Sequence, residues 1–168
     1  MANVIEIMNE IVNDTDVLSV KSSSDVLDDG YVGKLSGLVN GEMDLYNFAK
    51  GQATDPLVII AGADVYMDSY GNRVGYKDPR KITYPADRPV RAYRPRVGMR
   101  FKINTDAISG TPVKGQYVIP QNNNYQLLAA TNLISHTSGL ALEVEDAEAK
   151  IMIGKTLVNA TVLRVIRV

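Results

Sequence analysis

The apolar residues of this chain come in short runs, and glycine, proline and asparagine interrupt these runs throughout the sequence. Thirteen glycines and seven prolines are spread over 168 residues, and both residue types disfavour the interior of long helices. Short apolar runs with turn signals roughly every 8–12 residues are typical of β-sandwiches and small barrels. The sequence therefore predicts an all-β protein, built as a small β-barrel or β-sandwich.

The expected strands follow one another from residue 30 to the end of the sequence. Asn40-Gly41 is the strongest short signal for a hairpin turn, and it lies between two apolar runs. The run Leu57-Val-Ile-Ile-Ala61 is apolar at every position, which is typical of a strand that is buried on both faces. The strands are expected at residues 31–39, 43–48, 57–61, 90–93, 100–104, 117–120, 125–130, 140–144, 150–153 and 160–168.

Residues 1–29 differ from the rest of the chain, and we interpret them as an N-terminal arm and linker before a domain at residues 30–168. Residues 3–12 are too short to be stable as an isolated helix, so we expect them to become ordered against a partner. The residues that follow, up to Gly30, are polar and acidic apart from Val17-Leu-Ser-Val20, as expected of a linker. The apolar side chains near the start have helical spacing, which predicts a short amphipathic helix or an extended arm; they are Val4, Ile5, Ile7, Met8, Ile11 and Val12.

The composition excludes several kinds of site. The chain has no cysteine, so disulfides, thiolate catalysis and cysteine-ligated metals are ruled out. No run of about eighteen apolar residues occurs, and we expect no membrane span. The N-terminal sequence lacks the basic and apolar regions of a secretory signal, which predicts production in a cytoplasm.

Candidate catalytic residues are few. His136 is the only histidine, and its position between Ser135 and Thr137 in a polar turn is typical of a surface residue. Gly154-Lys-Thr156 resembles the end of a phosphate-binding loop, but the glycine required five positions earlier is Ala149. We therefore expect no catalytic, cofactor-binding or metal-binding residues, and no enzymatic activity.

An acidic cluster precedes the last expected strands, and it consists of Glu143, Glu145, Asp146 and Glu148. A divalent-ion site or a docking patch is one interpretation, and a solvated turn between two strands is the other. The spacing lacks the loop glycine and the ligand order of calcium loops, which favours the solvated turn. A carbohydrate-binding or hydrolytic barrel that uses Asp64, Asp68 or Glu143 is only a residual alternative. Hydrolysis of this kind needs two carboxylates opposite each other, and no spacing in the sequence places them so.

The charges are divided between two segments, although the formal net charge is −1. Residues 73–102 hold ten of the eighteen Lys and Arg against two Asp, which gives a net charge of +8. Residues 1–50 hold nine acids against three Lys, which gives a net charge of −6. Such a chain is more typical of docking onto a partner than of transforming a small molecule. The densest part is residues 88–103, with six cations and two aromatics in a strand-turn-strand pattern.

This basic segment has three interpretations. It could bind a protein with an acidic surface, because Arg and Tyr are good interface anchors. It could bind nucleic acid through phosphate contacts and stacking, although alternation places Phe101 in the core and the sequence pI of about 5.8 is low for such a domain. It could also be an exposed strand face whose cations offset the acids of residues 1–50. The partner-binding residues predicted from this segment are Arg88, Arg91, Tyr93, Arg94, Arg96 and Arg100.

Part of the chain also resembles a known family. The resemblance covers about residues 30–130 and follows the order of an apolar strand, a strand-turn-strand unit and a short final strand. In this order the chain is similar to the small head-decoration, or cement, proteins of tailed bacteriophages, which are encoded beside the major capsid protein. The segments that carry it are Asp55-Pro-Leu-Val-Ile-Ile-Ala61, Pro89-Val-Arg-Ala-Tyr-Arg94, Val97-Gly-Met-Arg-Phe-Lys-Ile103 and Gly115-Gln-Tyr-Val118.

The resemblance implies a non-enzymatic virion protein, made in the host cytoplasm, that binds the outer surface of an icosahedral capsid. There it would clamp neighbouring subunits of the major capsid protein, as a monomer or as a homotrimer at three-fold positions. No cofactor, no membrane and no nucleic-acid partner is expected. The N-terminal arm would reach over a neighbouring subunit, which adds Val4, Ile7, Met8 and Ile11 to the predicted interface. The alternative is a nucleic-acid-binding β-barrel that uses residues 88–102.

Overall fold

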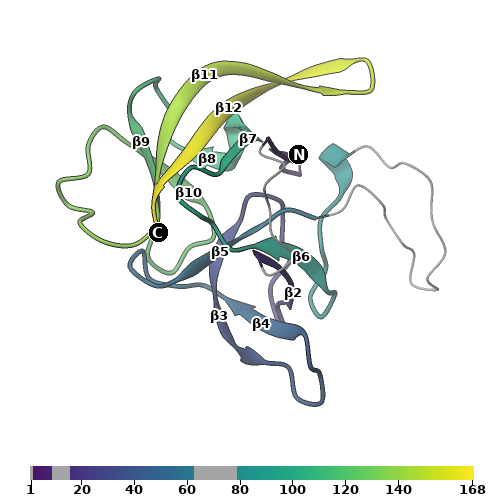
Figure 1. Cartoon of the computed structure of the whole chain (residues 1–168). Coiled ribbons are helices and arrows are strands. Elements are labelled where there is room, and N and C mark those ends of the chain that lie inside the picture. The colour runs from purple at the N-terminus through teal and green to yellow at the C-terminus, as the bar shows by residue number, and fades with distance from the viewer. Residues whose placement is uncertain (1, 9–15, 63–78) are drawn as a thin grey trace.

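The computed structural model of the chain describes residues 2–8, 16–62 and 79–168. Within these ranges the strands form a closed five-stranded barrel and a seven-stranded sheet (Figure 1), which confirms the predicted all-β class. None of the described helices has the length and hydropathy needed to cross a membrane. The elements are β1 (Ile5–Ile7), β2 (Val17–Lys21), β3 (Val32–Leu38), β4 (Leu45–Ala49), β5 (Leu57–Ile60), η2 (Pro79–Lys81), β6 (Val90–Tyr93), β7 (Arg100–Asn104), η3 (Thr105–Ala107), β8 (Ile108–Ser109), β9 (Tyr117–Pro120), β10 (Leu127–Ala130), β11 (Ala141–Ile153) and β12 (Thr156–Arg167).

The barrel has the strand order β2-β4-β3-β5-β6. Strand β2 closes the cylinder, because it pairs in parallel with β4 on one side and antiparallel with β6 on the other. The other neighbours in the barrel are antiparallel. Asn40-Gly41 lies at the tip of the β3–β4 hairpin, as predicted, and Gly41 has a φ of +82°, which residues with a side chain rarely adopt.

The seven-stranded sheet has the order β1-β7-β12-β11-β9-β10-β8. Strands β8 and β10 are parallel, and the remaining neighbours are antiparallel. The two edge strands, β1 and β8, have three and two residues. Edge strands this short present few unpaired backbone groups to other chains.

The two cores of the molecule share strand β5. Leu57 and Ile59 pack into the core between the barrel and the sheet, whereas Val58 and Ile60 pack inside the barrel. Successive side chains of a strand point to opposite faces, so a strand between two cores is apolar at every position. On the sheet side, Phe101 is fully buried in the shared core, as alternation predicted.

The predicted N-terminal arm is not confirmed by the described residues. Strand β1 pairs antiparallel with β7 at the edge of the sheet, so these residues are extended and not helical. Ile5 and Ile7 alternate along β1 and pack against the shared core, and this packing overrides the helical spacing of the local sequence. The segment interpreted as a linker contains β2, which is a strand of the barrel. Residues 2–8 and 16–29 therefore belong to the folded body.

Strands β11 and β12 form a long hairpin whose outer part projects beyond the sheet (Figure 1). The sequence predicted two strands, at 140–144 and 150–153, with an acidic turn between them. That prediction is wrong, because β11 is continuous and absorbs the extra residues as register shifts between Val144 and Asp146 and between Asp146 and Ala149. Bulges of this kind bend a strand and increase its twist, so the hairpin can leave the plane of the sheet at this point.

Candidate partner-binding surface

The basic segment passes from one sheet to the other. It includes β6 in the barrel and β7 in the seven-stranded sheet, joined by a tight turn. In this turn Gly98 has a φ of +90° and the Met99 amide donates to the Arg96 carbonyl oxygen at 2.9 Å. The strand-turn-strand pattern predicted for residues 88–103 is therefore present, but its two strands belong to different layers and present their side chains to different surroundings.

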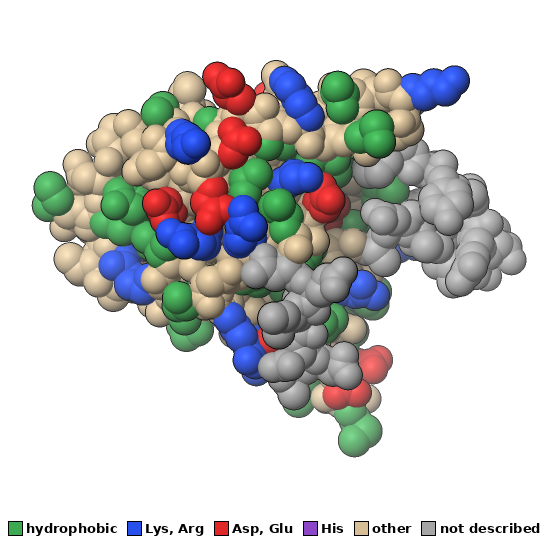
Figure 2. Space-filling model, turned by 45° about the horizontal axis from the view of Figure 1, so that its top comes forward, with side chains coloured by type: hydrophobic (Ala, Val, Ile, Leu, Met, Phe, Trp, Pro, Cys, Tyr) green, Lys and Arg blue, Asp and Glu red, His purple; other side chains and the backbone are tan. Residues whose placement is uncertain are grey.

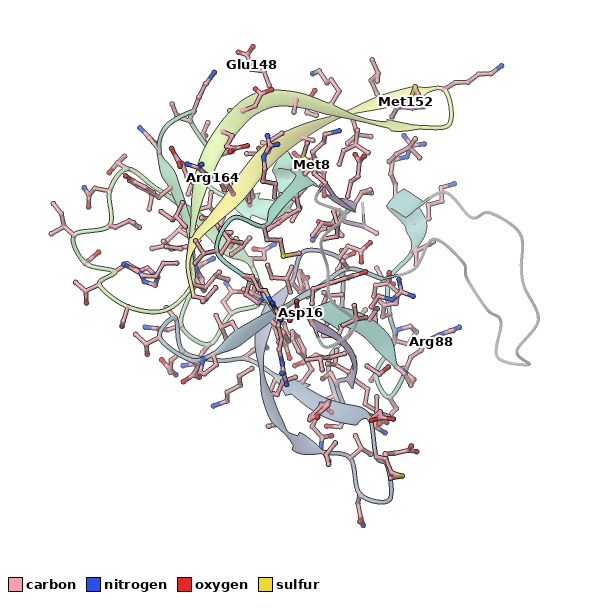
Figure 3. All side chains as sticks on the ribbon, viewed as in Figure 1. Met8, Asp16, Arg88, Glu148, Met152 and Arg164 are labelled. Carbon is pink, nitrogen blue, oxygen red and sulfur yellow. The ribbon has the colours of Figure 1, made fainter. Side chains whose placement is uncertain are left out.

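Three cations of this segment are held in ion pairs within the chain. Arg96 lies 2.6 Å from the carboxylate of Asp16, whose side chain is only 6% exposed (Figure 3). Lys102 on β7 lies 3.0 Å from Glu6 on β1. Both acids belong to the acidic segment 1–50, so the interpretation of the cations as charges that offset these acids holds for Arg96 and Lys102.

The third ion pair belongs to a network on the outer face of the sheet. Arg100 on β7 lies 2.6 Å from Glu145 on β11. Arg164 on β12 contacts both Glu145 and Glu143 (Figure 3), and these carboxylates raise the pKa of its guanidinium. Acidic and basic side chains accordingly intermingle on the face shown in Figure 2, so this face is not a surface of one charge.

The acidic cluster is therefore part of a strand and not a solvated turn. Glu143 and Glu145 take part in the ion pairs just described, and Asp146 accepts a hydrogen bond from the Glu148 amide at 2.9 Å within the bulge. No group of three His, Cys, Asp or Glu side chains in the described ranges is arranged to hold a metal ion. Asp64 and Asp68, the residual carboxylate candidates, lie outside these ranges.

Two other predicted interface residues have contacts within the fold. Tyr93 is half-buried and packs against the core between the barrel and the sheet, with Ile59 as its neighbour on β5. Arg88 is half-buried just before β6 (Figure 3). Tyr93 is thus a packing residue at the junction of the two layers, and its ring is only partly available to a partner.

Arg91 and Arg94 are the remaining cations of residues 88–103. Both are exposed, and neither forms an ion pair with another residue in the described part of the chain. Arg91 lies on the outer face of β6, opposite Ser19 of β2. Arg94 follows the end of β6, where its amide donates to the Asp16 carbonyl oxygen at 2.8 Å. Its backbone is thereby fixed while its guanidinium extends into solvent.

Arg94 borders a groove where the middle of β3 and the start of β5 meet the C-terminal end of β12. The groove has a volume of about 500 Å³. Most of its lining is apolar, and Lys34 and Asp55 at its rim lie 3.6 Å apart in an ion pair. This groove was not predicted from the sequence, because its lining comes from segments far apart in the chain. The lining residues are Lys34, Leu35, Asp55, Pro56, Leu57, Val58, Arg94, Pro95, Leu140 and Val168.

The N-terminal interface residues lie mostly within the fold. Val4 is buried and Ile7 packs against the shared core, so neither is presented to a partner by the described structure. Met8 is partly exposed at the end of β1 (Figure 3). Ile11 lies outside the described residues.

Buried polar groups fix the start of the chain. The Asn3 amide donates to both carboxylate oxygens of Asp28, at 3.0 and 2.9 Å, and the Val4 amide donates to Oδ1 of Asn104 at 2.8 Å. Burial raises the pKa of Asp28, and its hydrogen bonds with backbone amides oppose this increase. These contacts tie β1 to the loop after β2 and to the end of β7.

The remaining catalytic candidates have structural roles. His136 is buried, and its Nε2 lies 2.8 Å from the Leu140 carbonyl oxygen, so the prediction of a surface histidine is wrong. The loop folds over the ring, which the polar sequence around it did not indicate. Gly154 and Lys155 form the turn of the β11–β12 hairpin.

A comparison of the chain with known protein families, curated proteins and solved structures found no match.

Proposed function

We propose that this protein is a non-enzymatic structural protein of a tailed-bacteriophage virion, which binds the outer capsid surface and holds neighbouring major capsid protein subunits together. The observation that carries the proposal is the apolar groove of about 500 Å³ with Arg94 exposed at its rim. An apolar pocket beside an arginine is the kind of surface that anchors a protein partner. The capsid as partner rests on the sequence resemblance over residues 30–130.

The groove suits a short capsid segment that carries an apolar side chain next to a carboxylate. Pro56 and Val168 are exposed and offer apolar contact, which contributes about 25 cal/mol for each Å² removed from water. Lys34 is already paired with Asp55, so Arg94 is the rim cation left for the carboxylate. A guanidinium can bind a carboxylate through two parallel hydrogen bonds, and these are stronger than neutral ones.

Cementing follows when one copy contacts two subunits. The second contact is then intramolecular, and its effective concentration raises the avidity well above either affinity alone. Arg91, on the outer face of the barrel, is the second exposed cation of the same segment. We assign it to the same acidic capsid surface or to that of the next subunit.

Nucleic-acid binding is the second candidate, and the exposure of Arg91 and Arg94 is the observation that favours it. Two phosphate contacts give a weak interaction, with a salt slope of about −1.4 for a single strand. Arg96, Arg100 and Lys102 are paired with carboxylates, which leaves few cations to follow a phosphate backbone. This interpretation is therefore less well supported than protein docking.

The test is co-sedimentation of the purified protein with capsids of the encoding phage that lack it, in parallel with binding to single-stranded DNA. The proposal predicts saturable binding to capsids, at a fixed ratio to the major capsid protein, and no retention of DNA at moderate salt. Binding to DNA that weakens steeply with salt, without binding to capsids, would establish the second candidate instead.

A further inference from the structure

The outer part of the β11–β12 hairpin is a projecting ribbon that is both apolar and positively charged. Met152 and Leu157 lie directly opposite each other and are 75% and 64% exposed (Figure 3). Lys150 lies two residues before Met152 and shares its face, and Lys155 is in the turn. Residues 149–159 contain no acid, so this tip, the basic tip, has a net charge of +2.

The tip of the β3–β4 hairpin is apolar and negatively charged. Met43 is 87% exposed and Leu38 is 50% exposed. Glu42 and Asp44 flank Met43, are exposed, and form no ion pair with other residues that the structure describes. Residues 38–44 contain no cation, so this tip, the acidic tip, has a net charge of −2.

We propose that copies of this chain bind one another, with the basic tip of one copy against the acidic tip of the next. Figure 2 shows the two tips at separate ends of the molecule, one with green and blue side chains and the other with green and red ones. They therefore do not meet within one chain. Each tip offers exposed methionine with a second apolar side chain, and methionine adapts its shape to a partner surface.

Charge selects the second copy as the partner. Two basic tips or two acidic tips repel each other, whereas a basic and an acidic tip bring opposite charges together at short range. The contact is heterologous, because two different patches meet, so it builds rings or open chains and not closed two-fold dimers. Each tip is small, which places the contact in the weak class of interfaces and makes it sensitive to salt. The proposal does not depend on what binds the groove beside Arg94.

Disulfide trapping tests the contact in solution, without capsids, and the absence of native cysteine gives a clean background. Met43→Cys and Met152→Cys proteins, one of them carrying an affinity tag, are mixed and oxidised mildly at low salt. We expect the mixed disulfide to form about tenfold faster than either disulfide between identical variants, and about 0.5 M salt to remove this advantage. The matched control mixes Met43→Cys with Ile134→Cys, because Ile134 is also strongly exposed. Equal rates in the two mixtures would overturn the proposal.

Charge reversal provides the second arm. Lys150→Glu with Lys155→Glu, introduced into the Met152→Cys protein, is expected to abolish the rate advantage. Glu42→Lys with Asp44→Lys in the Met43→Cys partner is expected to restore it. All four positions are exposed, so circular dichroism of each variant should match that of the parent. A rate advantage that survives the reversal of one tip alone would contradict the proposal.

Discussion

The cations on the barrel side of the basic segment and those on the sheet side have different roles. Arg91 on β6 and Arg94 just after it are exposed without an ion pair among the described residues. On β7, Arg100 and Lys102 are paired with Glu145 and Glu6. The two pairs lie close in the sequence, but β7 is an inner strand of its sheet, with Glu6 on the adjacent strand β1 and Glu145 on β11, beyond β12, on the other side.

A run of charges in a sequence is therefore not yet a charged surface. The ion-pair partners of the β7 cations are Glu6 on β1 and Glu145 on β11, and these carboxylates neutralise the cations. At the end of β6 the carboxylate of Asp16 is already paired with Arg96, so within the described part of the chain Arg91 and Arg94 have no acidic partner. A mutation on β7 is therefore expected to change stability, whereas a mutation of Arg91 or Arg94 is expected to change binding.

The largest expected effect is on the buried side of β7. Phe101→Ala leaves a cavity in the core shared by the barrel and the sheet, where Phe101 is fully buried. We expect the free energy of unfolding to fall by about 3–5 kcal/mol, measured by urea denaturation. A decrease below about 1 kcal/mol would show that this core is not packed as described.

The next effect concerns the turn between the two strands. Arg96→Ala leaves the carboxylate of Asp16 without its cation in a site where that side chain is 6% exposed. We expect a loss of about 1–2 kcal/mol, because an unpaired polar group retains its desolvation penalty. Asp16→Asn in the Arg96→Ala background should recover part of this loss. If it recovers none, the loss does not arise from the unpaired carboxylate of Asp16.

Removal of the two β7 cations is expected to have a smaller effect. Arg100→Gln with Lys102→Gln breaks two surface ion pairs, each of which contributes about 0–1 kcal/mol. The midpoint of urea unfolding should shift slightly at low salt and less at high salt. Arg91→Gln with Arg94→Gln removes the same charge and should leave the midpoint unchanged.

The smallest effect is a pH dependence at the N-terminal contact beside β7. Burial raises the pKa of Asp28 above 3.8, so the folded state binds its proton more tightly than the unfolded state does. The stabilisation from this group is present below pH 3.8 and is lost as the pH rises through the raised pKa. Asp28→Asn removes this loss, so the stability of the variant relative to the wild type should increase from about pH 4 to pH 7. A difference that does not vary with pH would contradict this assignment.

Much of the barrel and the sheet could be predicted from local sequence. The apolar run at β5 and the Asn40-Gly41 turn gave the correct structure, because their signals depend on near neighbours alone. Strands β1 and β2 were missed, since three and five residues give too short a pattern to separate a strand from a helix or linker. What defines them is pairing with β7 and β6, and the paired residues are at least 70 positions apart in the sequence.

The candidate site was less predictable than the fold. The segment that contains Arg91 and Arg94 was identified from its charge, but the ion pairs that distinguish these residues from Arg96 and Arg100 involve Asp16 and Glu145. Asp16 and Glu145 lie too far from these arginines in the sequence for a local pattern to identify them as ion-pair partners. The groove beside Arg94 was missed for the same reason, because it forms only when β3, β5 and the end of β12 come together.

The most direct test of this account compares two charge-matched double variants in a saturation binding experiment with capsids that lack the protein. Arg91→Gln with Arg94→Gln removes the exposed cations, and Arg100→Gln with Lys102→Gln removes the paired ones. We predict that the first variant binds about tenfold more weakly than the wild type and that the second binds within a factor of about two. Equal weakening of both variants, or undiminished binding by the first, would contradict it.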